Sequence, residues 1–294
     1  MLAKRWATLC LALIVVACGG GEGKNPATED KQSFTFRDYK EKGVYLSSDL
    51  ESAKEHWITL SLQPTYGLTP EQSINIQASV PGRLILFADQ GKNKLAPYDD
   101  FFNYVDLAAA NPRFEYVYVY DELFWDGAKD TIGWREDDVA NASNYARSKG
   151  IKAIVDILPY TILNPDFKLK NYNAFDVIAI NLYPSMMVNK ETHGCKYNNN
   201  LYTNILYCSQ KKLRDSGFRG EVWYVYQAFG LTSDSPQELE SNFKLQQETI
   251  KIAPSFDIST VLPFGLYLGK EELNAEPYLI PGKGSSFEAL VNPR

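Results

Sequence analysis

Residues 114–126 read FEYVYVYDELFWD, and the rest of the chain is organised around this stretch. It begins as an apolar run of aromatic and β-branched residues, which is typical of a buried strand. It ends in two adjacent carboxylates, Asp121 and Glu122, and Trp125 follows before the turn signal Asp126-Gly127. Desolvating an unpaired charge is costly, so we expect the acid pair to lie at the carboxyl-terminal mouth of the strand. In a parallel α/β fold, functional sites are built at that end.

Short apolar runs of this kind alternate with longer helical segments over most of the chain. The sequence predicts strands over 43–47, 56–62, 83–88, 114–120, 151–155, 175–180, 221–226 and 260–266. It predicts helical segments that begin at Thr69 or cover 98–110, 135–149, 164–172, 201–214 and 235–252. This alternation predicts a (β/α)8 TIM barrel. The alternative is an open doubly wound sheet, but no Gly-x-Gly-x-x-Gly follows a strand and there is no Walker motif.

Local signals mark several of the helix ends. Thr69-Pro70-Glu71-Gln72 combines a capping residue with proline at the first helical position, so a helix should begin there. Gly150 should end the helix that begins near Arg135, and Ser216-Gly217 should end the helix that begins at Leu201.

Composition narrows the range of functions. The 294 residues suffice for one large domain or two small ones. Lys and Arg number 30 against 36 Asp and Glu, so the formal net charge is −6, which argues against nucleic acid as a partner. The only histidines are His56 and His193, which disfavours a histidine metal site or a Ser-His-Asp triad. We expect no metal and no cofactor.

The amino terminus has the pattern of a targeting segment. Lys4-Arg5 precede a short apolar stretch that is too short to span a bilayer comfortably. The end of this stretch, VVACG at 15–19, resembles a bacterial lipobox, which implies cleavage after residue 17 and lipidation of Cys18. The alternative is a plain signal peptide with an incidental cysteine. Gly19 after the cysteine, by resemblance to enterobacterial sorting, implies a lipid anchor in the outer membrane of the cell envelope.

The remaining chain divides into a tether and one domain. Residues 18–33 are rich in glycine and charge, so we expect a flexible tether followed by a barrel domain over 34–294. Removing residues 1–17 leaves 28 cations against 36 anions, a net charge of −8, so membrane contact should come through the lipid. Cys195 and Cys208 are the natural disulfide pair in an oxidising compartment, and two free thiols are the alternative.

The carboxyl ends of the predicted strands collect acids, amides and aromatic side chains. In a barrel these ends open on one face, so they should form a single cup. Aromatic faces stack on pyranose rings, amides and acids bind hydroxyls, and a protonated acid cleaves a glycosidic bond. The cup should contain Asp89, Asp121, Glu122, Trp125, Asp156, Asn181, Tyr183, Tyr226, Gln227 and Tyr267. Each also has a purely structural interpretation, such as an ion pair for Glu122 or Asp156.

The chain resembles the TIM-barrel glycoside hydrolases at three strand ends. Residues 118–122, YVYDE, look like the end of strand 4, where many of these enzymes place the acid/base glutamate. Residues 176–184, DVIAINLYP, and 221–230, EVWYVYQAFG, look like the ends of strands 6 and 7. Retaining enzymes carry a nucleophilic glutamate at the end of strand 7, where this chain has Gln227. An amide is a poor nucleophile, so this departure argues against the usual retaining mechanism with two glutamates.

Two other mechanisms remain open at this stage. Enzymes acting on N-acetylhexosamines often carry an adjacent acid pair at strand 4, and this resemblance implies Glu122 as general acid, Asp121 as the group that orients the acetamide, and Tyr183 as a possible acetamide ligand. Alternatively, Asp156 or Asp89 supplies the second carboxylate. A carboxyl separation of about 5 Å would then indicate retention, and about 6.5–9.5 Å inversion.

Three functions therefore follow from the sequence. The first is a lipid-anchored, monomeric glycoside hydrolase that cleaves a polysaccharide or glycan outside the cytoplasm. The second is a barrel that binds glycans without cleaving them, which Gln227 favours because it removes a nucleophile. The third is a scaffold lipoprotein, which a cup without converging acids and aromatic rings would favour.

Overall fold

Eight parallel strands form a closed barrel in the order β1 to β8. The computed structural model describes residues 41–45, 60–62, 65, 68–80, 82–88, 97–120, 123–124, 134–184, 192–227 and 236–264. The strands are β1 (Glu41–Tyr45), β2 (Leu60–Leu62), β3 (Arg83–Phe87), β4 (Phe114–Tyr120), β5 (Lys152–Ile157), β6 (Val177–Leu182), β7 (Glu221–Gln227) and β8 (Thr260–Phe264). Each pairs with its neighbours in sequence, and β1 closes the ring against β8. The predicted TIM barrel is confirmed.

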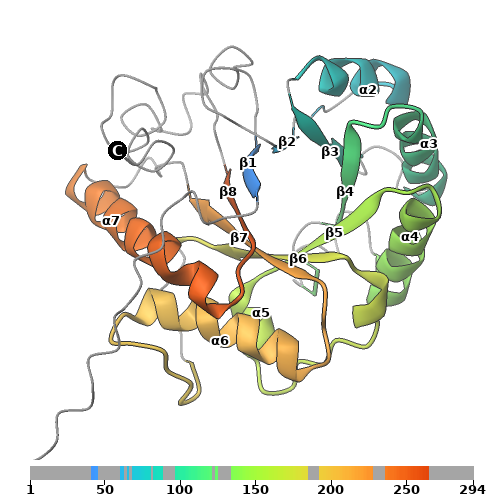
Figure 1. Ribbon diagram of the computed structural model, residues 1–294. Coiled ribbons are helices and arrows are strands. Elements are labelled where there is room, and N and C mark those ends of the chain that lie inside the picture. The colour runs from blue at the N-terminus through green and yellow to red at the C-terminus, as the bar shows by residue number, and fades with distance from the viewer. Residues whose placement is uncertain are drawn as a thin grey trace, which may run out of the picture. The chain divides into compact units, whose positions relative to one another are not determined.

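Helices connect the strands and lie outside the ring that the strands form (Figure 1). The α-helices are α2 (Pro70–Ser79), α3 (Pro97–Ala109), α4 (Glu136–Ser148), α5 (Pro159–Leu163), α6 (Leu201–Asp215) and α7 (Pro236–Ile252). Two 3-10 turns, η3 (Tyr172–Ala174) and η5 (Ala253–Phe256), precede β6 and β8. Because every crossover returns the chain to the same end of the barrel, all strands run in one direction.

Alternation along the strands creates two separate apolar cores. One core fills the barrel and includes Ile85, Tyr116, Ile154, Trp223 and Leu262. The other lies between the sheet and the helices and takes the intervening strand residues, such as those at 84, 117, 155, 222 and 261. Strands covered on both faces read as nearly continuous apolar runs, which is why the strands were visible in the sequence.

The predicted helix ends are found where the local signals placed them. Thr69 caps α2: its hydroxyl accepts from the Gln72 N–H, and the Gln72 side chain accepts from the Thr69 N–H. Gly150 and Gly217 follow α4 and α6 with φ of +83° and +101°, a conformation that a side chain disfavours.

The predicted helical segment at 164–172 is wrong. The helix in this part of the chain is α5, which begins at Pro159 and ends at Leu163. Pro165 explains the difference, because the residue before a proline is disfavoured in the helical conformation. Strand β5 also extends two residues beyond the predicted end at Val155, so Asp156 lies inside the strand and not after it.

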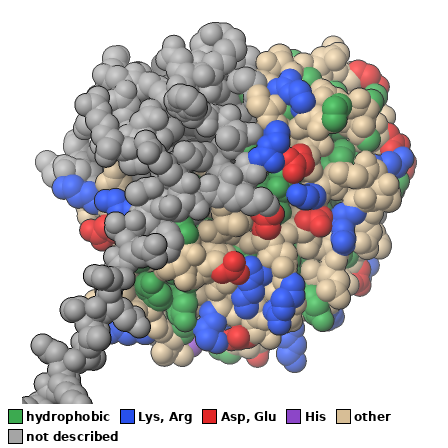
Figure 2. Space-filling view, viewed as in Figure 1, with side chains coloured by type: hydrophobic (Ala, Val, Ile, Leu, Met, Phe, Trp, Pro, Cys, Tyr) green, Lys and Arg blue, Asp and Glu red, His purple; other side chains and the backbone are tan. Residues whose placement is uncertain are grey.

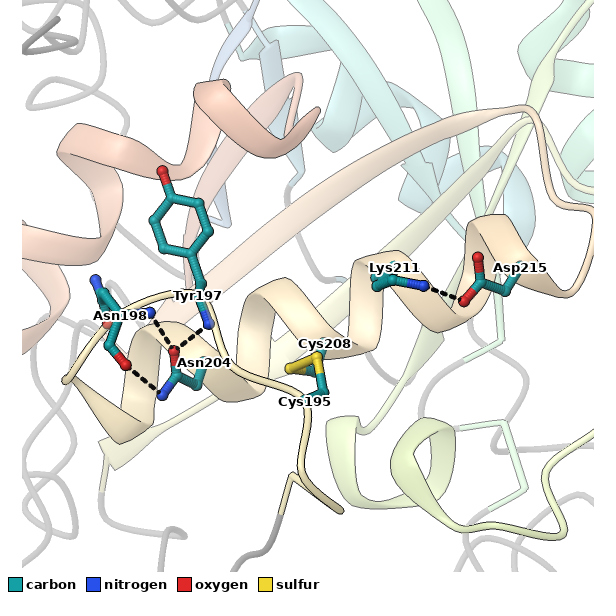
Figure 3. Close-up of a disulfide and its surroundings, with 7 residues drawn as sticks. All are labelled: Cys195, Tyr197, Asn198, Asn204, Cys208, Lys211 and Asp215. Carbon is teal, nitrogen blue, oxygen red and sulfur yellow. Dashed lines mark hydrogen bonds and ion pairs between the residues drawn. A yellow bond between two sulfur atoms is a disulfide. The ribbon is translucent and has the colours of Figure 1, made fainter. Parts of the chain in front are cut away.

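A disulfide joins the loop before α6 to the helix itself, as the sequence predicted. Cys195 and Cys208 have sulfur atoms 2.07 Å apart and Cα atoms 6.0 Å apart. Cys208 is buried on α6, so the bridge holds residues 192–200 against that helix (Figure 3).

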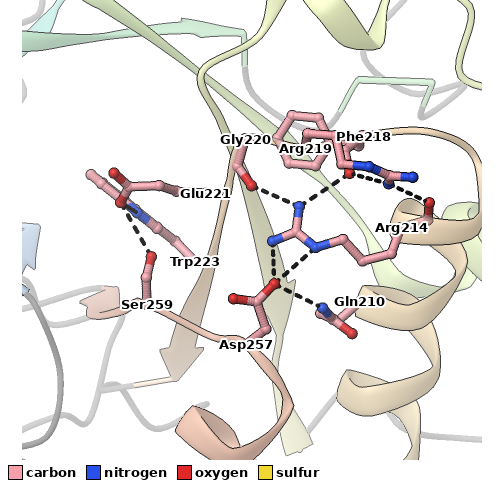
Figure 4. Close-up of polar contacts among 9 residues, drawn as sticks. All are labelled: Gln210, Arg214, Phe218, Arg219, Gly220, Glu221, Trp223, Asp257 and Ser259. Atoms are coloured by element: carbon pink, nitrogen blue, oxygen red, sulfur yellow. Dashed lines mark hydrogen bonds and ion pairs between the residues drawn. The ribbon is translucent and has the colours of Figure 1, made fainter.

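The amino-terminal end of the barrel is held by paired charges. Arg214, near the end of α6, donates to the Asp257 carboxylate over 2.5 Å and 2.9 Å and to the carbonyl oxygen of Gly220 over 2.7 Å (Figure 4). Glu221 accepts from the Trp223 indole N–H over 3.0 Å and from the Ser259 hydroxyl over 3.2 Å. These contacts tie α6 to the start of β7 and β8, and they give this end of the barrel a structural role.

The described surface carries charges of both signs, interspersed over the face in Figure 2. Within the described residues, no helix is both long and apolar enough to cross a membrane. The predicted signal peptide, the predicted lipidation site at Cys18 and the predicted tether lie outside the described residues.

Candidate functional site

The carboxyl ends of the strands meet at one rim of the barrel, where TIM-barrel sites are built. Beneath this rim the barrel interior changes from apolar to polar. Tyr116 and Trp223 fill the barrel lower down, and their rings meet edge to face with centres 5.0 Å apart. Further along the strands the interior positions become Asp156 on β5 and Asn181 on β6. The change from apolar to polar occurs where a ligand would enter.

Asp156 is the most deeply buried carboxylate of this interior. It is 0% exposed, and the hydroxyl of Tyr118 donates to its Oδ2 over 2.9 Å. Tyr118 belongs to the interior core, and β-strand alternation places Asp156 on the same face as Ile154. Burying a carboxylate in such an environment has a substantial desolvation cost, and this favours a functional role for Asp156.

Asn181 lies on the neighbouring strand, on the same face. Asp156 pairs in register with Ala179, so Asn181 is two residues further along β6. It is 5% exposed, and its Oδ1 has no hydrogen-bond partner among the described residues. Tyr183 follows β6, is 4% exposed and packs with the interior core. The structure thus brings Asp156, Asn181 and Tyr183 together with Tyr118 at one end of the barrel.

Gln227 is the last residue of β7 and pairs in register with Phe264. Its position has the same parity as Trp223 and Val225, which belong to the interior core. Its side chain lies outside the described part of the structure.

Tyr226 lies on the other side of the sheet and does not join this site. It belongs to the core between sheet and helices, and its ring centre is 5.9 Å from that of Tyr224. It is 1% exposed, and burial raises the pKa of its hydroxyl well above the usual value. The strand-end argument placed Tyr226 and Gln227 in one cup, whereas alternation separates adjacent residues onto opposite faces.

The remaining predicted site residues lie outside the described residues: Asp89, Asp121, Glu122, Trp125 and Tyr267. The described residues that flank the acid pair are Tyr120, at the end of β4, and Leu123. The Leu123 N–H donates to the carbonyl oxygen of Asp156 over 2.8 Å. The segment that follows β4 is therefore hydrogen-bonded to β5 at Asp156, the residue with the buried carboxylate.

Sequence reasoning missed Tyr118. Its signal was present in residues 114–120, where tyrosines at 116, 118 and 120 alternate with valines at 117 and 119. Period-two alternation places Tyr116 and Tyr118 in the barrel interior, but a register shift against β5 after Tyr118 puts Tyr120 in the outer core. Only the folded structure shows that Tyr118 reaches Asp156. In the described part of the chain, no group of three His, Cys, Asp or Glu residues could hold a metal ion.

Comparison with known proteins supports the fold. No family model and no curated protein matches the sequence. A chitinase from Chromobacterium violaceum ATCC 12472 resembles the structure with a TM-score of 0.50 and 10% identity, over 79% of this chain and 96% of that chain. A spore cortex-lytic enzyme from Bacillus megaterium QM B1551 has a TM-score of 0.48 and 8% identity over 82% of this chain and 72% of that one. An intracellular xylanase from Thermoanaerobacterium saccharolyticum has a TM-score of 0.47 and 14% identity over 86% and 99%. The chain shares the TIM-barrel fold with the chitinase.

Proposed function

We propose that this chain is a lipid-anchored glycoside hydrolase that cleaves an N-acetylhexosamine-containing polysaccharide or glycan outside the cytoplasm. The observation that carries the proposal is the buried pair of Tyr118 and Asp156, which faces the barrel interior beside the amide of Asn181. Hydroxyl, carboxylate and amide groups above an aromatic floor match the hydrogen-bonding groups and apolar faces of a sugar.

Glu122 is the proposed general acid. It lies between Tyr120 and Leu123 in the sequence, and Leu123 is hydrogen-bonded to the backbone of Asp156. In this mechanism Glu122 protonates the leaving oxygen, and the neighbouring Asp121 orients the substrate acetamide. Asp156, held by Tyr118, supplies negative charge beneath the positive charge that develops at the anomeric carbon.

The substrate class rests on the residues, because the chitinase likeness shows the fold alone. The adjacent acids and the amide at Gln227 favour assistance by the substrate's own acetamide over a second glutamate as nucleophile. Such a mechanism requires an N-acetyl group on the sugar at the cleavage point.

A glycan panel tests the proposal. We would incubate the purified full-length protein with N-acetylhexosamine polymers and with matched polymers lacking the acetamide, and quantify new reducing ends. A positioned general acid contributes about 10²–10⁴-fold in rate, so Glu122→Gln should lower the rate by at least about 100-fold. Asp156→Asn should also lower it strongly. Asp106→Asn, the same change in an exposed carboxylate on α3, is the matched control and should keep the parent rate.

The same panel decides the alternative function, a barrel that binds glycans without cleaving them. Gln227 at the end of β7 favours this alternative, because it places an amide where a retaining enzyme has its nucleophile. Binding by the parent and by Glu122→Gln, with no reducing ends from either, would establish a binding protein and refute the hydrolase. Cleavage of the polymers without acetamide at an equal rate would refute the substrate-assisted mechanism.

The proposed anchoring has its own test. Incorporation of labelled palmitate into the parent chain, and its loss in Cys18→Ser, is the expected result for a lipoprotein of the cell envelope. Equal labelling of both chains would contradict lipidation at Cys18.

A further inference from the structure

A groove of about 660 Å³ lies along helix α6. Its lining includes Cys195 in the loop before α6, Leu163 at the end of α5 and Pro165 just after it. The Cys195–Cys208 disulfide, drawn in Figure 3, is part of this lining. None of its lining residues belongs to a strand, so the groove is separate from the site in the barrel.

The groove is basic although the whole chain is acidic. Its lining includes Lys196, Lys211 and Lys212 against one carboxylate, Asp215. Lys211 forms an ion pair with Asp215, four residues later on the same face of α6, and the Lys211 Nζ and Asp215 Oδ2 atoms are 2.6 Å apart. Two lysines in the groove are left without that compensation.

Lys196 and Lys212 form no ion pair with a carboxylate within the described residues. Lys212 donates to the carbonyl oxygen of Asn164, and its ammonium lies 5.8 Å from the centre of the Phe167 ring. Burial lowers the pKa of Lys212, because its ammonium group has lost part of its hydration, and the Asp166 carboxylate offsets this only in part. An anion in the groove would restore the favourable interactions of this charge.

The groove at the amino-terminal end of the barrel provides a contrast. It also carries several charged side chains, but two of its three cations are paired with carboxylates, and the third, Arg219, donates to the carbonyl oxygens of Arg214 and Phe218. Lys152 pairs with Glu115 at 3.4 Å, and Arg214 pairs with Asp257 at 2.5 Å. Three carboxylates line that groove beside its three cations, whereas one carboxylate lines the groove along α6 beside three lysines, so an excess of positive charge distinguishes the groove along α6.

Aromatic rings stand beside the two lysines. Tyr207 lines the groove, and its ring lies 5.0 Å from Tyr197 and 5.6 Å from Phe256, centre to centre. The Tyr197 hydroxyl is hydrogen-bonded to Ser255 at 2.8 Å, which helps to fix this cluster. Tyr197 does not line the groove itself, whereas Tyr207 lines it and is half-buried. A fixed, partly exposed aromatic ring suits stacking against a sugar face.

We propose that the groove along α6 is a second, non-catalytic saccharide site that binds a carboxylated sugar unit of an acidic polysaccharide. Lys196 and Lys212 contact the carboxylate, and Tyr207 packs against the apolar face of the ring. The saccharide part of this inference rests on the proposed function, whereas the preference for negative charge rests on the lysines alone. Such a site would hold an acidic polymer on the enzyme while the barrel acts on it.

Calorimetric titration with hexagalacturonate, a carboxylated probe, and with cellohexaose, a neutral one, tests the proposal. The full-length chain with Glu122→Gln serves as parent, so that no probe is cleaved. We expect binding of hexagalacturonate that weakens with salt, and little binding of cellohexaose. Lys196→Gln with Lys212→Gln should weaken binding about tenfold or more.

The matched control is Lys149→Gln with Lys251→Gln. This double variant also removes two lysine charges, one just after α4 and one in α7. It should bind like the parent. Tyr207→Leu should weaken binding as well, and its thermal unfolding shows whether the fold is kept. Equal loss in the groove and control variants, equal binding of cellohexaose, or no binding at all would overturn the inference.

The outcomes separate this inference from the proposed function. Binding in the groove without hydrolysis by the chain that retains Glu122 would keep the second site and refute the hydrolase. Hydrolysis without binding that depends on the groove lysines would support the hydrolase and refute the second site.

Discussion

Tyr118 and Asp156 show how a hydrogen bond from the neighbouring strand stabilises a carboxylate inside the barrel. Their oxygen atoms are 2.9 Å apart, and both side chains are buried. A hydrogen bond to a charged group in a water-poor interior is stronger than the same bond at the surface.

Tyr118→Phe removes only the hydroxyl that donates to Asp156. Loss of a donor to a buried acceptor costs about 1–3 kcal/mol, so we expect the free energy of unfolding to fall by about 2 kcal/mol in urea denaturation. Tyr145→Phe is the matched control, since its hydroxyl donates to the exposed Asp106 carboxylate over 2.8 Å, where water can replace it. Equal losses in the two variants would contradict this account.

Tyr202 links the end of β6 to β7 from the outer side of the sheet. Its hydroxyl donates to the carbonyl oxygen of Leu182 over 2.6 Å and is hydrogen-bonded to the hydroxyl of Tyr224. Burial raises the pKa of Tyr202 well above its usual value, and the bond to Tyr224 offsets this in part.

Stability should therefore depend on alkaline pH. In the unfolded chain Tyr202 ionises near pH 10, whereas the folded protein keeps it protonated. The unfolded state then binds fewer protons, so the free energy of unfolding should fall as pH rises above about 10. Denaturant unfolding at pH 8 and pH 11 measures this, and Tyr202→Phe should show a shallower fall. An identical slope in the variant would count against the raised pKa.

At the scale of elements, α2 shows how much four adjacent residues can specify. Thr69 and Gln72 exchange side-chain and backbone hydrogen bonds of 3.1 Å and 3.3 Å, and Pro70 occupies the first helical position. The cap was readable from the sequence because all the groups that form it are neighbours in the chain.

Thr69→Ala should destabilise the protein by about 1 kcal/mol, because the Gln72 N–H loses its acceptor. Thr69→Ser keeps the hydroxyl and should remain close to the parent in the same thermal unfolding measurement. A similar loss in both variants would show that the methyl group, not the cap, matters.

The disulfide is the covalent constraint on the loop that leads into α6. A cross-link closing about 15 residues contributes about 3 kcal/mol by restricting the unfolded chain. We expect Cys195→Ala with Cys208→Ala to lower the free energy of unfolding by this order in urea. The double variant leaves no free thiol at either position. An unchanged denaturation midpoint would show that contacts such as that of Asn204 with the Tyr197 N–H hold the loop alone.

At the scale of the whole molecule, closure of the barrel depends on β1. Within the described residues, β1 pairs with β8 at two positions, Glu41 with Thr260 and Lys42 with Val261. Without β1, strands β2 and β8 would each present an unpaired edge, and exposed edges promote aggregation.

A chain that starts at residue 46 should therefore aggregate or lose its cooperative thermal transition. A chain that starts at residue 34 keeps β1, which begins at Glu41, and should unfold like the full-length protein. Light scattering and calorimetry on the two truncations measure the difference. A soluble, cooperatively folded chain from residue 46 would contradict the role given to β1.

The sequence by itself determined the architecture: the parallel strands and their order, the barrel, the capped start of α2, the ends of α4 and α6, and the disulfide pair. These features follow from patterns of neighbouring residues, such as apolar runs, glycines after helices and a proline after a capping threonine. It also determined that Asp156 and Asn181 come near the ends of their strands.

Only the tertiary structure decided which of these side chains meet. It placed Tyr226 in the core between sheet and helices, showed that Tyr118 holds Asp156, and placed Lys196 and Lys212 beside Tyr207 in one groove. Tyr118 and Asp156 lie 38 residues apart in sequence. Whether such residues touch depends on strand register and on which face each strand presents, and these are set by the packing of the closed barrel as a whole.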